Sequence, residues 1–62
     1  MLRVAAAINS LPEDQRTAVI QRDLLGVSVA ETAEQMGRTP KSVAGLLLRG
    51  RGALRRLLQD EQ

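Results

Sequence analysis

The residues of this sequence best suited to chemistry are a group of cations in its C-terminal half. Between residues 38 and 56 there are six basic side chains and no acidic one: Arg38, Lys41, Arg49, Arg51, Arg55 and Arg56. A stretch of one sign attracts a polyanion, because guanidinium and ammonium groups pair with phosphates and guanidinium also pairs with guanine. The pattern therefore predicts a nucleic-acid contact, with an ordinary solvated helix face as the alternative.

The same sequence offers little for catalysis. It contains no histidine and no cysteine, which removes the commonest general base, the thiolate nucleophile and the commonest metal ligands. It also contains no Phe, Trp or Tyr, the residues on which single-strand and RNA binders stack bases. We therefore expect a chain that is not an enzyme and holds neither metal nor cofactor, and whose nucleic acid is double-stranded DNA.

Length and hydropathy limit the chain to one small domain. It has 62 residues and a net charge of +2. Its longest apolar run is far shorter than the roughly 20 residues that span a bilayer, and its start lacks the cleavage pattern of a signal peptide. The expectation is a single cytoplasmic domain over residues 1–62, without a membrane contact and cut from a longer protein.

Apolar spacing and boundary signals predict four helices. With their capping residues they cover residues 2–9, 12–26, 28–37 and 39–58. The apolar side of the second helix is expected to contain Ala18, Val19, Ile20 and Leu24. Gly26 and Gly37 end the second and third helices, since glycine readily adopts the left-handed conformation of a helix C-terminus. No segment alternates in the manner of a strand, so the prediction is an all-α fold with no sheet.

Three helix starts have identifiable caps. Ser10 is the expected N-cap of the second helix. Ser28 and Glu31 have the spacing of a capping box at the start of the third. Thr39 followed by Pro40 marks the start of the fourth, because proline at the first helical position sacrifices no hydrogen bond.

The third and fourth helices have the lengths and order of a helix-turn-helix over residues 28–58. Gly37 lies in the turn, and the third helix is expected to bury four residues: Val29, Ala30, Ala33 and Met36. The predicted fold is a four-helix, winged-helix-like domain. A plain helical hairpin within some other bundle is the alternative.

A helical wheel separates two faces of the fourth helix. The apolar face contains Val43, Leu47, Gly50, Leu54, Leu57 and Leu58. The opposite, polar face contains Lys41, Ser42, Gly45, Arg49, Gly52 and Arg56. Close packing explains Gly50, whereas Gly45 and Gly52 suit close approach to a ligand or are tolerated flexibility. Leu46 and Leu48 lie on the flanks, and Leu48 is expected to be exposed, where it can meet a thymine methyl or a protein.

Three motifs follow one another without a gap between residues 11 and 58. Leu-Pro with Gln-Arg is formed by Leu11, Pro12, Gln15 and Arg16. Gly-x-Ser-x-x-Glu-x-Ala is formed by Gly26, Ser28, Glu31 and Ala33. A glycine, a valine and Arg-x-Arg-x-Ala-Leu are formed by Gly37, Val43, Arg49, Arg51, Ala53 and Leu54. Together these residues resemble region 4 of the sigma-70 family, particularly the extracytoplasmic function (ECF) sigma factors.

The resemblance implies that the fourth helix reads the −35 element of a promoter in the major groove. It also implies docking on the flap of the RNA polymerase β subunit and capture by an anti-sigma factor, with the domain acting as a monomer. Matched positions near DNA at the helix start are Arg38, Thr39, Lys41 and Ser42. Matched groove-facing positions are Gly45, Leu48 and Arg49. The sequence departs from the family at Ala44 and Leu46, where basic side chains are usual.

Two further functions fit the residues. A response-regulator-type helix-turn-helix has a similar layout but usually dimerises on a two-fold site. A protein-interaction domain without a DNA role would use Leu46 and Leu48 as a contact patch. The Leu-Pro-x-x-Gln-Arg opening and the Arg-x-Arg-x-Ala-Leu ending favour the sigma factor.

Overall fold

The structure, a computed structural model, describes residues 3–59. Five elements follow one another along the chain: α1 (Arg3–Asn9), α2 (Glu13–Val19), the π-helical segment η1 (Ile20–Leu24), α3 (Val29–Met36) and α4 (Pro40–Gln59). Within residues 3–59 there is no strand, and the predicted all-α fold is confirmed. Leu2, expected at the start of the first helix, lies outside the described residues.

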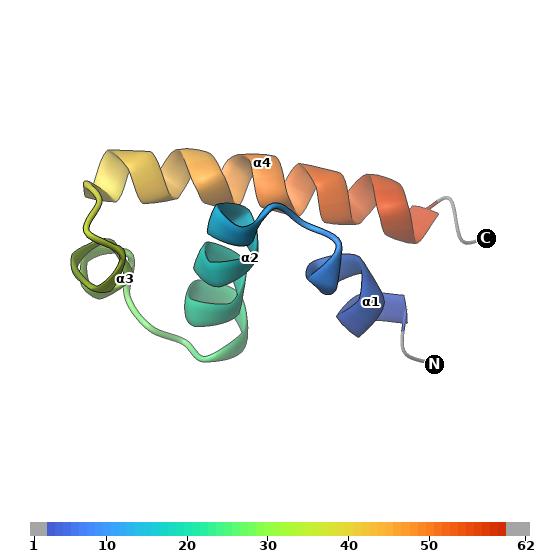
Figure 1. Ribbon diagram of the computed structural model, residues 1–62, viewed down its shortest axis with the longest axis horizontal. Coiled ribbons are helices and arrows are strands. Elements are labelled where there is room, and N and C mark those ends of the chain that lie inside the picture. Colours follow the sequence, from blue (N-terminus) through green and yellow to red (C-terminus); the bar gives the residue numbers. More distant parts are fainter. Residues whose placement is uncertain (1–2, 60–62) are drawn as a thin grey trace.

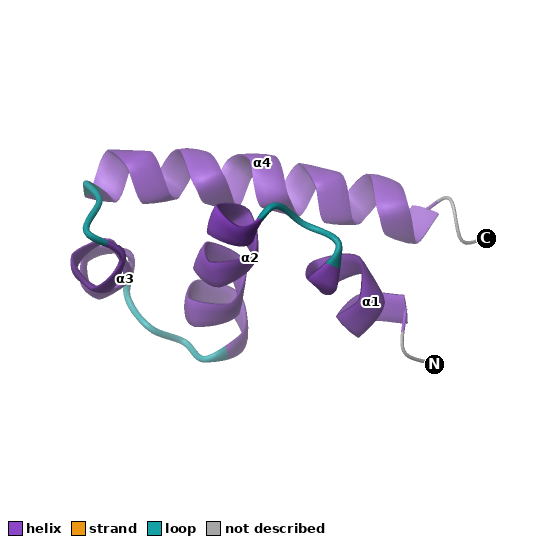
Figure 2. Cartoon of the chain, viewed as in Figure 1, coloured by secondary structure: helices purple, strands orange, loops and turns teal. Residues whose placement is uncertain are grey.

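The longest helix, α4, is the scaffold of the molecule. Its 20 residues span about 30 Å at 1.5 Å per residue, close to the 36 Å length of the whole fold. Figure 1 shows α3 at one end of α4, α2 across its middle and α1 near its other end, all on the same side. The opposite side of α4 is therefore left open, and Figure 2 shows that only short loops connect the elements.

The helix-turn-helix forms as the capping signals predict. The Oγ of Ser28 accepts a hydrogen bond from the Glu31 N–H at 3.0 Å, which starts α3. Gly37 ends α3 in the left-handed conformation, with φ +67°, and lets the chain turn towards α4. The Oγ1 of Thr39 then accepts a hydrogen bond from the Ser42 N–H at 3.1 Å. In Figure 1 α3 is seen nearly end-on while α4 runs across the view, so the two helices cross steeply.

The connection between α1 and α2 differs from the prediction. Ser10 does not cap α2; its Oγ donates to the carbonyl oxygen of Ala7 at 2.7 Å and so belongs to the end of α1. Pro12 is the N-cap residue, without a side-chain hydrogen bond. Arg16 holds this turn instead, since its Nη1 donates to the carbonyl oxygens of Asn9 at 3.1 Å and Leu11 at 3.4 Å.

The second predicted helix is not α-helical throughout. After Val19 the chain widens into η1, whose larger turn shifts the later side chains around the helix axis. Leu24 and Leu25 are consequently exposed, at 60% and 65%, although helical spacing assigned Leu24 to the apolar side. Gly26 then adopts φ +74° and ends the segment, as expected.

The core is aliphatic and small. Its buried cluster consists of Leu11, Ala18, Val19, Ala33, Val43, Leu46 and Leu47. Two residues that were expected to be buried are exposed: Ala30, with Thr32 fully buried in its place, and Leu57, which is 40% exposed. Leu46, expected on the flank of the apolar face, is only 5% exposed, because the buried face of α4 is turned further towards it than the helical wheel suggested. This burial removes Leu46 from the contact patch expected with Leu48.

Gly50 lies where α2 crosses α4. A Cβ atom at this position would lie 3.0 Å from Cγ2 of Val19 and 3.5 Å from Cβ of Gln15. At this distance Val19 would have to shift by a few tenths of an ångström to accept a methyl group, which a buried, β-branched side chain resists. The expectation that Gly50 serves close packing is therefore confirmed. Among residues 3–59, no helix combines the length and apolar character needed to cross a membrane.

Candidate nucleic-acid interface

The uncovered side of α4 carries most of the predicted site. Lys41, Leu48 and Arg49 are exposed along its first half, and Gly45 is partly exposed between them. Val43 and Leu47, which point the other way, are buried. Leu48 is 76% exposed, which confirms that it lies outside the core. With Thr39 at the cap, five of the seven predicted DNA-contacting residues share this side, which we call the open face of α4.

Gly45 and Gly52 leave space along α4 that arginine side chains occupy. A Cβ atom at Gly45 would lie 3.5 Å from Nη1 of Arg49, so the guanidinium group folds back along the helix over the space that Gly45 leaves free. Gly52 and Arg56 repeat this arrangement, with Nη1 of Arg56 at 3.8 Å from the Cβ position. Two arginines thereby lie flat along α4, seven residues apart and on related faces of the helix.

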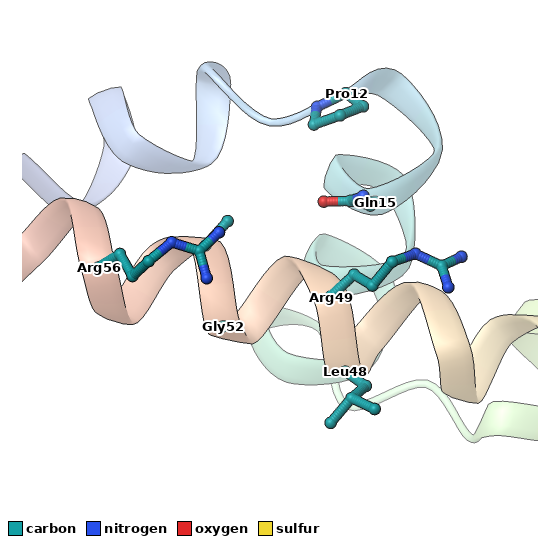
Figure 3. Close-up of a pocket in the computed structure, with 7 residues that line it drawn as sticks. Pro12, Gln15, Leu48, Arg49, Gly52 and Arg56 are labelled. Atoms are coloured by element: carbon teal, nitrogen blue, oxygen red, sulfur yellow. The ribbon is translucent and has the colours of Figure 1, made fainter.

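A shallow groove runs between the start of α2 and α4. It is lined by Pro12, Gln15, Leu48, Arg49, Gly52, Ala53 and Arg56. Figure 3 shows the Arg49 and Arg56 side chains at the edge of the exposed surface of α4 that borders α2, while Leu48 points away from α2. Arg49 is therefore the member of the open face that also lines the groove. None of these seven residues is acidic, so the groove and the adjoining open face favour a negatively charged ligand.

Arg38 and Ser42, the other two predicted residues, face the protein itself. The Nη2 of Arg38 donates to the carboxylate of Asp14 in α2, and its Nη1 donates to the Oγ of Ser42 at 3.1 Å. One third of the Arg38 side chain remains exposed. The structure thus brings Arg38 and Ser42 together at the start of α4, but as partners of each other and of α2.

A second ion pair joins η1 to α4. Arg51 meets Asp23 with both arms of its guanidinium group: Nε lies 2.9 Å from Oδ2 and Nη2 lies 2.6 Å from Oδ1. The hydrogen bonds from Arg51 lower the pKa of Asp23, a shift that partial burial opposes and that the charges of Arg51 and Arg22 reinforce.

The two ion pairs reduce the positive charge that the basic stretch offers to a ligand. Arg38 and Arg51 are bound to carboxylates that lie 24 and 28 residues earlier in the chain. Sequence reasoning counted both as part of a one-signed surface, since nothing in the local pattern signals such distant partners. The positive charge available at the open face therefore comes mainly from Lys41 and Arg49, with Arg55 and Arg56 further along α4.

The structure contains a helix-turn-helix, and the exposed face of its second helix, α4, carries no acidic residue. This fold is consistent with the family that the sequence matches. Residues 1–54 match the family described as Sigma-70, region 4. The chain belongs to this family.

The similar proteins refine this assignment. Two relatives, each called ECF RNA polymerase sigma factor SigM, come from Mycobacterium tuberculosis strains ATCC 35801 / TMC 107 / Erdman and ATCC 25618 / H37Rv. Each is 39% identical over 57 residues, which cover 92% of this chain and 29% of the relative. The resemblance to ECF sigma factors is thereby confirmed, and the chain spans less than a third of their length. No solved structure matches the chain.

Proposed function

We propose that this chain reads the −35 element of a promoter by placing the first half of α4 in the major groove, as the DNA-reading part of a sigma factor that directs RNA polymerase. The supporting observation is the open face of α4: a helix-turn-helix presents an uncovered helix with cations and no carboxylate. A major groove about 12 Å wide admits such a helix, and base edges within it carry a distinct pattern for each base pair.

The side chains suit different parts of this task. Arg49 is the base-reading residue, because a guanidinium group can donate to both O6 and N7 of guanine. Leu48 supplies an apolar contact for a thymine methyl. Gly45 has no side chain and so allows the bases to approach the helix backbone closely. Lys41 and Thr39, at the helix start, contact phosphates and set the position of the helix on the duplex.

Two residues depart from the family pattern, Ala44 and Leu46, and both predict that the isolated chain binds DNA weakly. Ala44 is exposed beside the reading residues and contributes no charge. Leu46 is buried, so a phosphate contact is excluded at that position. Each missing phosphate contact lowers affinity and flattens its salt dependence. In a longer sigma factor, tethering to polymerase and to a second promoter-reading domain would compensate by raising the effective concentration.

Protein partners are part of the same proposal. The β flap of RNA polymerase and an anti-sigma factor are the partners that the family resemblance implies. Leu24 and Leu25 expose apolar surface at the end of η1, away from the groove-reading residues of α4, which supports a protein contact there. The proposed role involves no catalytic step and no cofactor, and one chain occupies each DNA site.

Selection from a library of randomised DNA duplexes tests the proposal. The 62-residue chain is expected to enrich one asymmetric sequence, with an affinity that falls steeply as salt increases. Enrichment of a two-fold symmetric sequence by a dimer would instead indicate a response-regulator-type function. Binding that is independent of salt, or that stays undetectable even at the high chain concentrations that suit a weak binder, would indicate a protein-interaction domain and would contradict the proposal.

Two substitutions separate base reading from phosphate contact. Arg49→Ala is expected to reduce discrimination between the enriched duplex and a scrambled one, because it removes the base-reading group. Lys41→Ala is expected to weaken binding to both duplexes evenly and to reduce the slope of log affinity against log salt by about 1. Fluorescence anisotropy titrations at several salt concentrations measure both effects. Unchanged affinity and selectivity in Arg49→Ala would show that Arg49 does not read bases.

A further inference from the structure

We propose that Arg38 is a positioning residue: it fixes the start of α4 against α2 through Asp14 and Ser42 and does not itself contact DNA. This inference rests on the proposed function, because the position that it explains is that of the DNA-reading helix. It also gives Asp14, an acidic residue outside the helix-turn-helix, an indirect role in DNA recognition through Arg38.

The contacts of Arg38 link three parts of the fold. Its Nη2 donates to the carboxylate of Asp14 in the first turn of α2, and its Nη1 donates to the Oγ of Ser42 in the first turn of α4. Arg38 itself lies in the turn of the helix-turn-helix. A planar guanidinium group holds both partners in a fixed relative geometry, which a flexible ammonium group cannot do.

Ser42 carries this restraint into the reading helix. Its N–H donates to Oγ1 of Thr39, while its hydroxyl oxygen accepts from Arg38. Ser42 is therefore held from both sides, one residue away from Lys41 and three residues before Gly45. Binding sites built on rigid elements need supporting hydrogen bonds of this kind, because displacements of about 0.5 Å already weaken recognition.

The other end of the link is anchored in the core. Asp14 lies on α2, whose Ala18 and Val19 are buried against α4. In the turn between α3 and α4, Gly37 adopts a left-handed conformation, and backbone hydrogen bonds tie the turn to α3, with the Arg38 N–H donating to the Ala33 carbonyl oxygen at 2.9 Å. The Arg38 side chain ties the same turn to α2 as well, a helix that contributes Ala18 and Val19 to the core.

Removal of the Asp14 charge distinguishes two possible roles of Arg38, which are contact with a DNA phosphate and positioning of α4. If Arg38 contacted phosphate, Asp14 would compete with DNA for the guanidinium group, and its removal would strengthen binding. If Arg38 positions α4, removal of Asp14 releases the helix start and weakens binding, although the chain then carries one more net positive charge. The sign of the effect of Asp14→Asn therefore decides between the roles.

The experiment compares Asp14→Asn with Glu13→Gln, which removes the same charge from the neighbouring exposed residue of the same helix turn. Anisotropy titrations use the duplex that the wild-type chain enriches and a scrambled duplex, at a temperature where circular dichroism shows every variant folded. Asp14→Asn is expected to lower affinity for the enriched duplex about two- to fivefold, the range expected of a partly exposed ion pair. Glu13→Gln is expected to leave it unchanged or slightly higher.

Substitutions of Arg38 complete the test. Arg38→Lys keeps the charge but loses the two-armed geometry, so it is expected to weaken selective binding as Arg38→Gln does. The double variant Asp14→Asn, Arg38→Gln should bind no more weakly than either single variant, because all three break one link. In the free chain, hydrogen exchange of the Val43 amide, which donates to the Thr39 carbonyl at 3.0 Å, should be faster in Asp14→Asn than in Glu13→Gln.

Three results would overturn the inference. Tighter binding by Asp14→Asn would identify Arg38 as a phosphate donor that Asp14 restrains. Full binding by Arg38→Lys would show that its charge alone matters. Equal affinities and equal Val43 exchange in Asp14→Asn and Glu13→Gln would show that the link has no effect. These outcomes require a wild-type chain that selects DNA, whereas a wild-type chain that selects none contradicts the proposed function itself.

Discussion

At the scale of single residues, Thr32 is the most unusual member of the core. It is fully buried in α3, and its Oγ1 has no hydrogen-bond partner among the described residues. A buried hydroxyl without a partner costs about 1–3 kcal/mol of folding free energy. The side chain therefore fills space in the core with its methyl group, while its hydroxyl lowers the stability of a domain that is already small.

Thr32→Val is expected to stabilise the fold by about 1–2 kcal/mol, because valine keeps the shape and removes the unpaired hydroxyl. For a domain of this size, each kcal/mol corresponds to roughly 4–8 °C in melting temperature. Thr32→Ser is the control: it keeps the hydroxyl, loses the methyl group and should melt below the wild type. A Thr32→Val chain that melts below the wild type would show that the hydroxyl is satisfied in solution.

At the scale of elements, the glycines of α4 divide its surface by function. Gly50 allows α2 and α4 to approach, whereas Gly45 and Gly52 leave room for arginine side chains on the outer side. Glycine in a helix interior costs about 1 kcal/mol relative to alanine. The packing against α2 offsets that cost at Gly50, whereas Gly45 has no such contact within the fold. The proposed close approach of α4 to DNA would account for a glycine at position 45.

Alanine substitutions at the three glycines test this division. Gly45→Ala and Gly52→Ala are each expected to raise stability by up to about 1 kcal/mol, because their Cβ atoms meet only flexible arginine ends. Gly50→Ala should lower stability, since Val19 has to move. Gly45→Ala should also weaken binding to the enriched duplex, and Gly52→Ala, two turns further along, should not. Urea unfolding and anisotropy measure these effects; equal DNA affinities for all three variants would contradict the role of Gly45.

At the scale of the whole molecule, ion pairs between distant segments supplement a core without aromatic residues. Asp14–Arg38 joins α2 to the turn before α4, and Asp23–Arg51 joins η1 to the middle of α4. Both pairs connect the N-terminal half of the chain to the helix-turn-helix. They neutralise two basic residues that would otherwise enlarge the positive surface, and they link α4 and the turn before it to α2 and η1.

The Asp23–Arg51 pair makes stability depend on pH at the acidic end. Because the pKa of Asp23 is lower in the folded chain than its ordinary value of 3.8, the folded state favours the carboxylate. The stabilisation is complete above that ordinary value and is lost as the pH falls through the lower, folded pKa. For a partly exposed pair it amounts to about 0.2–1 kcal/mol.

Asp23→Asn is therefore expected to melt below the wild type at neutral pH, and the difference in melting temperature is expected to be smaller near pH 2, because the Asp23 carboxylate becomes protonated as the pH falls. Thermal unfolding followed by circular dichroism at the two pH values measures the difference. A difference of the same size at both pH values would show that the charge of Asp23 contributes nothing to the fold.

The helix caps and the turn could be predicted from the sequence because residues close to them in the chain determine them. Ser28, Thr39 and Gly37 act on the backbone within a few residues of themselves, so their caps and turn are readable before any packing is known. The exposure of Leu48 and the close packing of Gly50 also follow, because a long helix with a continuous apolar stripe leaves little choice of face.

What could not be predicted depends on how the helices meet. The buried face of α4 includes Leu46 because of where α2 and α3 lie, and α3 buries Thr32 in preference to Ala30 for the same reason. The change from α- to π-helix at Ile20 alters the spacing that a regular wheel assumes, so Leu24 was misplaced. Ion pairs such as Asp14–Arg38 join residues that no local pattern connects.

The most direct test of the central claim is amide chemical-shift mapping of the ¹⁵N-labelled chain with the duplex that it enriches. The largest shifts are expected on the open face of α4, at Thr39, Lys41, Gly45, Leu48 and Arg49, with small changes at Leu24 and Leu25. The scrambled duplex should shift the helix-start residues but not Leu48 and Arg49. Shifts centred on α1 or η1, with the open face of α4 unaffected, would contradict a promoter-reading role for this helix.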